Sequence, residues 1–315
     1  MFQPLLSLKK LKRPDLLGID LGSQCVKIVK MGRRPNDKLA VEFCGLYPIP
    51  RSSPDFESDL HGAVKEAGLA GLSAAVCLDD TSLKTRKMEL PAMPDADLKE
   101  AVRWNMREAV EGPVADYSIA SSLIEETTAG GKVRQTLLGY AVKKKSVIDL
   151  MNLATRIGLK PSAIEPSAVS LASAVDRAWP SDDLWIAGID LGAEKVVLTI
   201  LGRGRFYFTR LLPGLRSSDA KENGPEFMKK LAGEIQNSLD AFSVAFHQET
   251  IHRISLSGGG AGIGELPEYL AKNLAIQTSR LDPFAGMEMS DQAKKTVADK
   301  GYLFSQAVSL AWMNG

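Results

Sequence analysis

The pattern of apolar and polar positions repeats one feature twice along the chain. In residues 16–30, an apolar run reaches Asp20, breaks at a glycine, and resumes as a second apolar run. Residues 187–198 repeat this pattern, with Asp190 in the place of Asp20. Each segment predicts a β-hairpin whose tight turn follows an acidic residue. The repeat predicts two similar α/β lobes whose hairpin turns face each other across a cleft.

The two predicted turns carry groups that suit phosphate and a divalent cation. A turn glycine lets a ligand approach the main chain, and the amides around a turn form a concave anion site. An aspartate beside such a turn suits magnesium that carries a phosphate. A single Gly-Ser turn between strands is more often a plain connection than a ligand site. The second copy favours a phosphate-binding role for both turns. We expect Asp20 and Asp190 to hold magnesium directly or through water, and Lys27 to approach the phosphates. Main-chain contacts are expected from Gly22, Ser23, Gln24, Gly192 and Ala193.

A third element is a strand that ends in three glycines. Residues 254–257, in which isoleucine and leucine alternate with serines, lead into Gly258, Gly259 and Gly260, and a helix is predicted at residues 265–273. Backbone at such glycines can pack closely on the ribose and base of a nucleotide. The spacing differs from the Gly-x-Gly-x-x-Gly pattern of dinucleotide-binding folds, which argues against a hydride-transfer cofactor.

Between the two hairpins, residues 83–142 predict a small inserted α+β module. Its helix, at residues 95–110, has an apolar stripe that includes Met106, whereas Trp104 lies off that stripe. The faces of the module should pack on the first lobe and leave a seam between the two. Such a seam suits a short peptide, bound as an added strand or as a helix. Trp104 and Met106 are the candidate peptide contacts.

Three further segments complete the predicted architecture. Residues 161–175 predict a helix rich in small side chains, and residues 226–246 predict a long helix with one apolar face. Residues 301–312 predict a final helix that crosses back between the lobes.

Composition narrows the classes of function. A chain of 315 residues, of which 44% are apolar, can form two lobes with sizeable cores. The net charge of +1 argues against a dedicated nucleic-acid binder. No stretch reaches the roughly 18 apolar residues of a membrane-spanning helix, and no secretory signal peptide is expected.

Cysteine, histidine and the N-terminal residues add little chemistry. Cys25, Cys44 and Cys77 lie in apolar surroundings without a pairing pattern, so we expect buried thiols in a reducing cytoplasm. The three histidines lack the spacing of metal ligands. A basic amphipathic leader at residues 1–14 suits an anionic membrane surface, and a frayed terminus is the favoured alternative.

On these residues the chain resembles the PilM family of type IV pilus assembly proteins, which are actin-like ATPases related to the cell-division protein FtsA. The opening hairpin from Gly18 to Lys27 and the glycine loop at residues 257–261 carry the resemblance. The matching segments between and after them are residues 90–117, 137–142, 158–161, 231–242 and 282–284.

The resemblance implies a two-lobed α/β fold of the actin-like (ribonuclease-H-like) class with an inserted module in the first lobe. The implied division is a first lobe at 15–82, the module at 83–142, a return to the first lobe and a linker at 143–180, a second lobe at 184–300 with a shortened subdomain at about 215–250, and a closing helix at 301–315.

The resemblance also implies a cofactor and a partner. ATP with magnesium should bind in the cleft, and Glu226 and Lys230 should stand in for an acid and a lysine that approach the adenosine in the family. The partner is the short cytoplasmic tail of the inner-membrane pilus protein PilN, in the alignment subcomplex between the assembly motor and the envelope channel. The protein should therefore be cytoplasmic and peripheral at the inner membrane, with the motor or a second copy as further partners and no nucleic acid.

Three departures from the family pattern bear on affinity, and the first is a short stretch between Gly214 and Leu231. Glu194 stands at a phosphate-loop position that is usually small and uncharged, and a carboxylate there repels phosphates. Ser309 replaces a glycine that is expected in the closing helix. We therefore expect ATP to bind with modest affinity, and a vestigial site is the alternative.

Three other functions stay open. A small-molecule kinase of the same fold needs an acid for the acceptor's proton, and Glu165 is the only candidate beyond the two aspartates. A role like that of FtsA calls for an amphipathic membrane helix after a linker, whereas the chain ends at residues 312–315. A scaffold of a type II secretion system or of a mannose-sensitive (MSHA-type) pilus differs mainly in its partner. No residue stands out as a base for hydrolysis, so we expect at most a slow ATPase.

Overall fold

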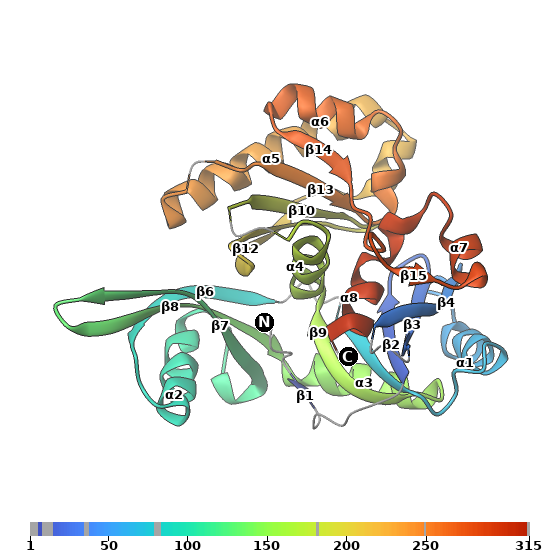
Figure 1. The fold of residues 1–315 in the computed structure, drawn as a ribbon, viewed down its shortest axis with the longest axis horizontal. Coiled ribbons are helices and arrows are strands. Elements are labelled where there is room, and N and C mark those ends of the chain that lie inside the picture. Colours follow the sequence, from blue (N-terminus) through green and yellow to red (C-terminus); the bar gives the residue numbers. More distant parts are fainter. Residues whose placement is uncertain are drawn as a thin grey trace.

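Three β-sheets and the helices that cover them make up the described part of the chain (Figure 1). The structure is a computed structural model that describes residues 6–7, 15–34, 38–78, 83–180, 183–248 and 250–313. The predicted amphipathic leader lies outside the described residues, apart from a two-residue strand at Leu6–Ser7.

The first sheet contains the opening hairpin. In spatial order its strands are β1 (Leu6–Ser7), β9 (Lys160–Pro166), β5 (Ser73–Leu78), β2 (Asp15–Leu21), β3 (Val26–Arg33), β4 (Leu39–Tyr47) and β15 (Glu288–Met289). Strands β2, β3 and β4 form an antiparallel meander, and β5 and β9 run parallel to β2. Helices α1 (Phe56–Glu66) and α3 (Lys144–Arg156) cover one face, and α7 (Asp291–Val297) and α8 (Ser305–Met313) cover the other.

The second sheet repeats the same core topology. Its strands, in spatial order, are β12 (Arg205–Leu212), β11 (Val196–Gly202), β10 (Trp185–Leu191), β13 (Arg253–Ser257) and β14 (Gln277–Arg280). Again an antiparallel hairpin, β10–β11, has a parallel neighbour, β13. Helices α5 (Gly224–Phe246) and α6 (Leu266–Leu274) lie on the outer side, and α4 (Ser167–Ala178) packs against α8 between the two sheets (Figure 1).

The long helix α5 follows the sequence prediction closely. The Asn223 side chain caps its start by accepting a hydrogen bond from the Glu226 amide, and a proline occupies the first turn. The apolar positions expected to face inward are all buried, namely Met228, Leu231, Ile235, Leu239 and Phe242.

The inserted module is a third sheet with one helix. Strands β6 (Lys84–Pro91), β8 (Lys132–Lys143) and β7 (Tyr117–Ala129) are antiparallel in that order, and α2 (Asp95–Asn105) covers one face. The module projects sideways from the two lobes (Figure 1). Short 3-10 turns complete the fold: η1 (Met106–Glu108), η2 (Val114–Asp116), η3 (Ser217–Lys221), η4 (Gly259–Gly262) and η5 (Gly301–Phe304).

The expectation that the module packs on the first lobe was incomplete. Ile124 of β7 and Leu138 of β8 belong to the apolar core of the second sheet. Arg205 donates a hydrogen bond to the Ile124 carbonyl, and Lys87 Nζ donates to the Ala245 carbonyl at 3.0 Å. The module therefore contacts both lobes, because its long strands reach past the first lobe to β12 and the end of α5.

The helix predicted at residues 161–175 was partly wrong. Residues 160–166 form β9, which pairs in parallel with β5, and the helix begins only at Ser167. Residues 162–166 of this strand are all buried, whether polar or apolar, so the segment lacks the alternation that separates a strand from a helix. Pro161 and Pro166 can stand in β9 because its other neighbour is only the two-residue β1.

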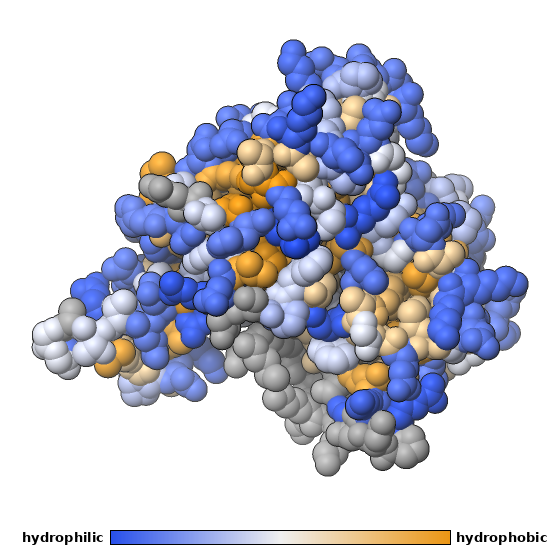
Figure 2. Space-filling view, turned by 45° about the horizontal axis from the view of Figure 1, so that its top comes forward, coloured by the Kyte–Doolittle hydropathy of each residue, from blue (hydrophilic) through white to orange (hydrophobic). Residues whose placement is uncertain are grey.

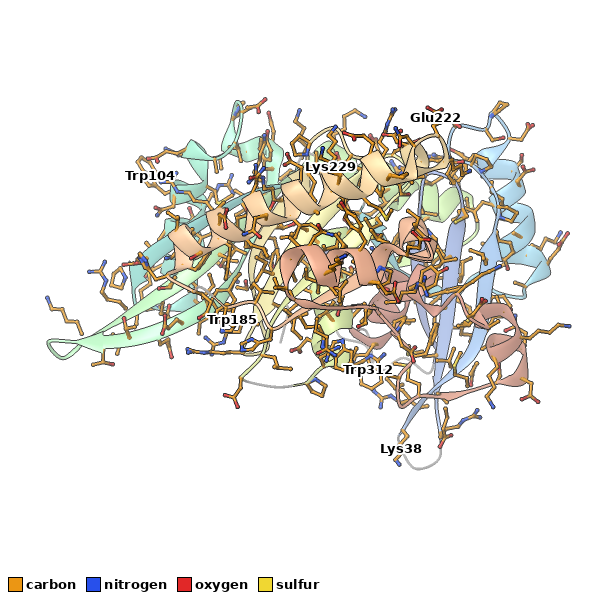
Figure 3. All side chains as sticks on the ribbon, turned by 90° about the horizontal axis from the view of Figure 1, so that it is seen from above. Lys38, Trp104, Trp185, Glu222, Lys229 and Trp312 are labelled. Atoms are coloured by element: carbon orange, nitrogen blue, oxygen red, sulfur yellow. The ribbon has the colours of Figure 1, made fainter. Side chains whose placement is uncertain are left out.

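The surface is mostly hydrophilic, with apolar atoms gathered near the centre of one face (Figure 2). No described helix combines the length and hydropathy that a membrane span requires. Trp104 is 64% exposed on α2, and it lies at the outer edge of the module when the molecule is seen from above (Figure 3).

Candidate functional site

The two acid-glycine hairpins open into one cavity of about 330 Å³ between the lobes. Asp20 stands at the end of β2 opposite Lys27 in the register of the hairpin, and Asp190 stands at the end of β10. The first lobe contributes Asp20, Gly22, Ser23, Gln24, Cys25, Lys27 and Arg51 to the lining. The second lobe contributes Asp190, Gly192, Ala193, Glu194, Lys195, Gly258 and Gly259. The structure thus brings together most of the residues that the sequence singled out.

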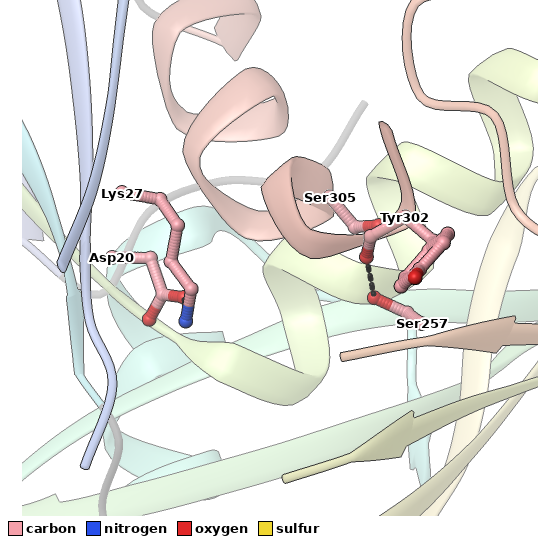
Figure 4. A network of polar contacts seen from close by, with 5 residues as sticks. All are labelled: Asp20, Lys27, Ser257, Tyr302 and Ser305. Atoms are coloured by element: carbon pink, nitrogen blue, oxygen red, sulfur yellow. Dashed lines mark hydrogen bonds and ion pairs between the residues drawn. The ribbon is translucent and has the colours of Figure 1, made fainter. Parts of the chain in front are cut away.

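Asp20 and Lys27 form a buried ion pair in the cavity wall (Figure 4). Lys27 Nζ lies 2.9 Å from Asp20 Oδ2, and both residues are less than 10% exposed. Burial alone would lower the pKa of Lys27, but the charge of Asp20 and its hydrogen bond outweigh burial and raise that pKa. A Cβ atom on Gly22 would lie 2.6 Å from Lys27 Nζ, so glycine leaves room for the ammonium group beside the turn. Lys27 is therefore a fixed cation at this turn.

The glycine loop after β13 lies against the second aspartate. Gly258 has a φ of +81°, and a Cβ atom there would collide with Asp190 Oδ1. The Gly258 amide donates to the Tyr302 carbonyl at 3.1 Å, and Ser257 Oγ donates to the same oxygen at 3.1 Å (Figure 4). This carbonyl also accepts a bond from Ser305 Oγ, in the first turn of α8. The loop beside Asp190 is thereby tied to the start of the closing helix.

Several cavity residues were missed in the sequence. They are Arg51, Ser167, Lys195, Leu303 and Gln306, and also Cys25, which was expected to be a buried thiol. Cys25 is only half-buried, because it stands in the turn rather than in a strand. The Arg51 amide donates to the Ser23 carbonyl at 2.9 Å, which places this residue beside the first turn. These residues come from separate segments, and no local pattern marks them.

Three residues expected at the adenosine do not line the cavity. Gly260 is buried, and a Cβ atom there would lie 2.6 Å from Ser217 Cβ and 2.8 Å from Leu191 Cβ. Lys230 Nζ donates to the Gly214 carbonyl at 2.7 Å, and Glu226 is exposed at the start of α5. These three residues lie outside the lining of this cavity, and their contact with adenosine stays a prediction.

The donor set fits magnesium that is carried by phosphate. Among the described residues, no group of three or more His, Cys, Asp or Glu side chains lies close enough to hold a metal ion. Asp20 and Asp190 instead stand on opposite lobes around one cavity. Magnesium keeps several water ligands and is commonly bound by one or two carboxylates together with substrate phosphates. The residues therefore fit a hydrated magnesium ion with a nucleotide, rather than an all-protein metal site.

A second cavity, of about 370 Å³, lies at the seam between the module and the first lobe. Its module side includes Glu111, Asp116 and Tyr117, and its other side is formed by Lys143 at the end of β8 and by Lys144 and Lys145 at the start of α3. Tyr117 Oη donates to the Glu111 carbonyl at 3.0 Å, and Lys84 Nζ lies 3.1 Å from Glu111 Oε1. The seam therefore offers a polar cavity with charges of both signs.

Neither candidate peptide contact lies at this seam. Met106 is fully buried in the module core, where its Sδ atom lies close to Gly139, so the structure contradicts a role in contacting a partner. Its place in the apolar stripe of the helix explains this burial. Trp104 is exposed, with the Arg107 guanidinium 4.0 Å from its ring centroid, but it does not line the cavity.

Comparisons with known proteins identify the family. The family model described as "Type IV pilus assembly protein PilM" matches residues 18–212 and 224–314. Among solved structures, the chain is similar to one described as "PilM-PilN type IV pilus biogenesis complex", with 18% identity, coverage of 97% of this chain and 99% of that chain, and a TM-score of 0.78.

Weaker similarities reach other proteins. The ethanolamine utilization protein EutJ from Carboxydothermus hydrogenoformans has a TM-score of 0.46 at 12% identity, with 97% of this chain and 92% of that chain covered. The cytoplasmic domain of EpsL, from the type II secretion system of Vibrio cholerae, has a TM-score of 0.48 at 9% identity, with 96% and 95% covered. The predicted α/β actin-like ATPase fold is confirmed. The chain belongs to the type IV pilus assembly protein PilM family.

Proposed function

We propose that this protein is a nucleotide-binding scaffold of type IV pilus assembly. It binds ATP with magnesium between the lobes and captures the cytoplasmic tail of a PilN-like inner-membrane protein in the seam between the module and the first lobe. The observation that carries the proposal is the cavity between the lobes, which both hairpins line with an aspartate, Asp20 and Asp190.

Different residues of the cleft bind the phosphates, the magnesium ion, and the ribose and base of the nucleotide. The amides of residues 22–24 and 192–193 bind phosphate oxygens, and the Lys27 cation offsets phosphate charge. Asp20 and Asp190 would hold a magnesium ion, directly or through water, and the ion would supply positive charge that offsets the charge of the phosphates. Gly258 and Gly259 let the ribose and base pack on bare backbone.

Nucleotide acts in this scaffold as a ligand that is hydrolysed slowly or not at all. Glu165, the further acid considered for kinase chemistry, is 1% exposed at the end of β9 and does not line the cavity. Burial, and after it the charge of Glu165, raises the pKa of Tyr140, which places this carboxylate near a buried phenol. Bound ATP biases lobe closure through its differential affinity for the closed state.

The tail-binding site is the polar cavity at the seam. The similar solved structure is described as a complex of PilM with PilN, which supports a PilN-like partner for this chain. The lysines at the start of α3 and the acids of the module give this cavity anchors for side chains of either charge. Because the partner is a membrane protein, tail capture holds the scaffold at the inner face of the membrane, within the alignment subcomplex.

Point variants test the seam better than deletion of the module, since deletion would expose the core around Ile124 and Leu138. The probe is a synthetic peptide of the PilN-like protein's cytoplasmic tail, measured by calorimetry with and without ATP and magnesium. We expect Lys144→Glu to weaken peptide binding about tenfold, as for the loss of a charged hydrogen bond, with ATP affinity unchanged. The control Lys99→Glu, on the exposed face of α2, should leave both affinities unchanged. Peptide affinity that is unaffected by Lys144→Glu would place the tail elsewhere.

A further inference from the structure

One polar side chain on the closing helix faces the cleft without a protein partner. Gln306 of α8 is 4% exposed and lines the cavity between the lobes. Buried polar groups in proteins are nearly always hydrogen-bonded. Among the described residues, no hydrogen bond reaches the side-chain amide of Gln306, and its polar atoms are not among the fully buried atoms that lack a partner, so the amide is accessible from the cavity that it lines.

The neighbours of Gln306 place it between the two aspartates. One turn earlier, Leu303 lines the same cavity, and the adjacent Tyr302 carbonyl holds the Gly258 amide beside Asp190. On the other side, Ala307 lies against Gly18, two residues before Asp20 in β2. The helix therefore carries Gln306 across the floor of the cleft from the second lobe to the first.

A purely structural role does not account for this side chain. Ser305 and Ser309 are equally buried on the same helix, and both hydroxyls have partners within the protein. Ser305 Oγ donates to the Tyr302 carbonyl at 3.2 Å, and Ser309 Oγ lies 3.6 Å from Met313 Sδ. Gln306 differs from both because its amide is directed to the cavity.

We infer that Gln306 is a ligand-contacting residue, whose amide hydrogen-bonds the hydrated magnesium–phosphate end of a nucleoside triphosphate between Asp20 and Asp190. The inference rests on the proposed nucleotide function. Ionised carboxylates only accept hydrogen bonds, whereas a side-chain amide both donates and accepts. The Gln306 side-chain carbonyl would accept a hydrogen bond from water held by the magnesium ion, and the amide adds no charge to the cleft.

The inference predicts that Gln306 matters mainly when magnesium is present. Gln306→Leu keeps most of the side-chain volume and removes both polar groups. We expect this variant to bind ATP with magnesium about tenfold more weakly, as for the loss of a hydrogen bond to a charged ligand. ATP affinity in the presence of a chelator should stay within about twofold of wild type. A packing defect would weaken both affinities alike.

The test is a calorimetric titration of ATP, with magnesium and with a chelator, into the full chain. Ser238→Ala is the control, since it removes a buried hydroxyl from α5 outside the cleft, and it should bind like wild type in both conditions. Gln306→Glu is the second variant. Its carboxylate should repel the phosphates and so lower the affinity for ATP in the presence of chelator. Magnesium should therefore raise the ATP affinity of this variant by a larger factor than that of wild type.

The outcomes separate the two levels of the proposal. Gln306→Leu that binds like wild type, or that loses affinity equally in both conditions, overturns the role of Gln306 and leaves the nucleotide site standing. Wild-type protein that does not bind ATP in either condition overturns the nucleotide function, and the role of Gln306 with it.

Discussion

Gly18 of β2 is in direct contact with Ala307 of α8, and a Cβ atom on Gly18 would collide with the Ala307 carbonyl oxygen. The same Cβ atom would lie 2.5 Å from the Ala311 amide nitrogen. This close approach seats the closing helix on the strand that ends at Asp20. The first hairpin and the helix that carries Gln306 therefore form one packed unit.

Gly18→Ala should separate these two elements. Overpacking of a well-filled site costs about 1–3 kcal/mol, and here the obstacle is backbone that cannot rotate away. We expect urea unfolding to show a loss in this range, together with weaker ATP binding. Gly264→Ala is the control, because nothing lies within 4 Å of its added Cβ atom. Equal stability of the two variants would contradict the packing described for α8.

The rate at which thiol reagents modify Cys25 should fall when nucleotide is bound in the cleft. Cys25 is half-buried and lines the cleft, whereas Cys44 and Cys77 are each at most 1% exposed. We expect Cys25 to be alkylated first, and ATP with magnesium to slow that reaction. Mass spectrometry of the labelled peptides measures both effects. Labelling of Cys25 at the same rate with and without saturating ATP would contradict a phosphate site at this turn.

The free energy of unfolding should fall at alkaline pH because the Cys44 thiol ionises less readily in the folded protein than in the unfolded chain. Burial raises the pKa of this thiol from 9.0 to about 12. Below pH 9 the thiol is protonated in both the folded and the unfolded state and adds no pH dependence. Between pH 9 and 12 only the unfolded chain releases the proton, so the free energy of unfolding falls by about 1.4 kcal/mol per pH unit.

Urea unfolding of the reduced protein at pH 8 and pH 10.5 measures this effect. We expect wild type to lose about 2 kcal/mol more across this interval than Cys44→Ala loses, by the same linkage. The comparison of the two slopes removes the contribution of other groups, such as the buried Tyr140. Identical pH dependence in both proteins would mean that the Cys44 thiol ionises normally.

Substitution of Met106 and of Trp104 should change stability by very different amounts, although the two residues stand only two positions apart. Met106 is fully buried between α2 and the module sheet, so Met106→Ala should cost about 2–5 kcal/mol, as for large-to-small core changes. Trp104 is 64% exposed, and Trp104→Ala should change stability by less than about 0.5 kcal/mol. Thermal unfolding of both variants checks the contrast. A large loss of stability in Trp104→Ala would show that the Trp104 side chain makes contacts that this structure does not contain.

The paired hairpins were predictable because their signal is local. An apolar run, an acid, a turn glycine and a second apolar run lie within one short segment, and β2–β3 and β10–β11 occupy the predicted residues. The residues predicted to contact phosphate through their main chain, and the two aspartates predicted to hold magnesium, therefore line one cavity. The buried face of α5 was predictable for the same reason, since helical periodicity runs through its whole length.

Features that depend on tertiary contacts were missed or misplaced. Strand β9 was taken for a helix, because its burial on both faces removes any periodic signal. Arg51, Ser167 and Gln306 meet in the cleft from segments far apart in the chain, so only the fold places them together. Glu226 and Lys230 were assigned by family resemblance alone, and neither lines the cavity between the lobes.

The central claim is that magnesium-bound nucleotide lies between Asp190 and the first hairpin, with Glu194 as an opposing charge. Its most direct test is one calorimetric titration of ATP with magnesium into wild type, Asp190→Asn and Glu194→Gln. Asp190 is the better aspartate to change, because Asp20 is the partner of the buried Lys27 cation. The account predicts saturable binding to wild type, affinity lower by about tenfold in Asp190→Asn, and higher affinity in Glu194→Gln, where a repulsive charge is gone. Absence of binding to wild type, or equal affinities in all three proteins, would contradict it.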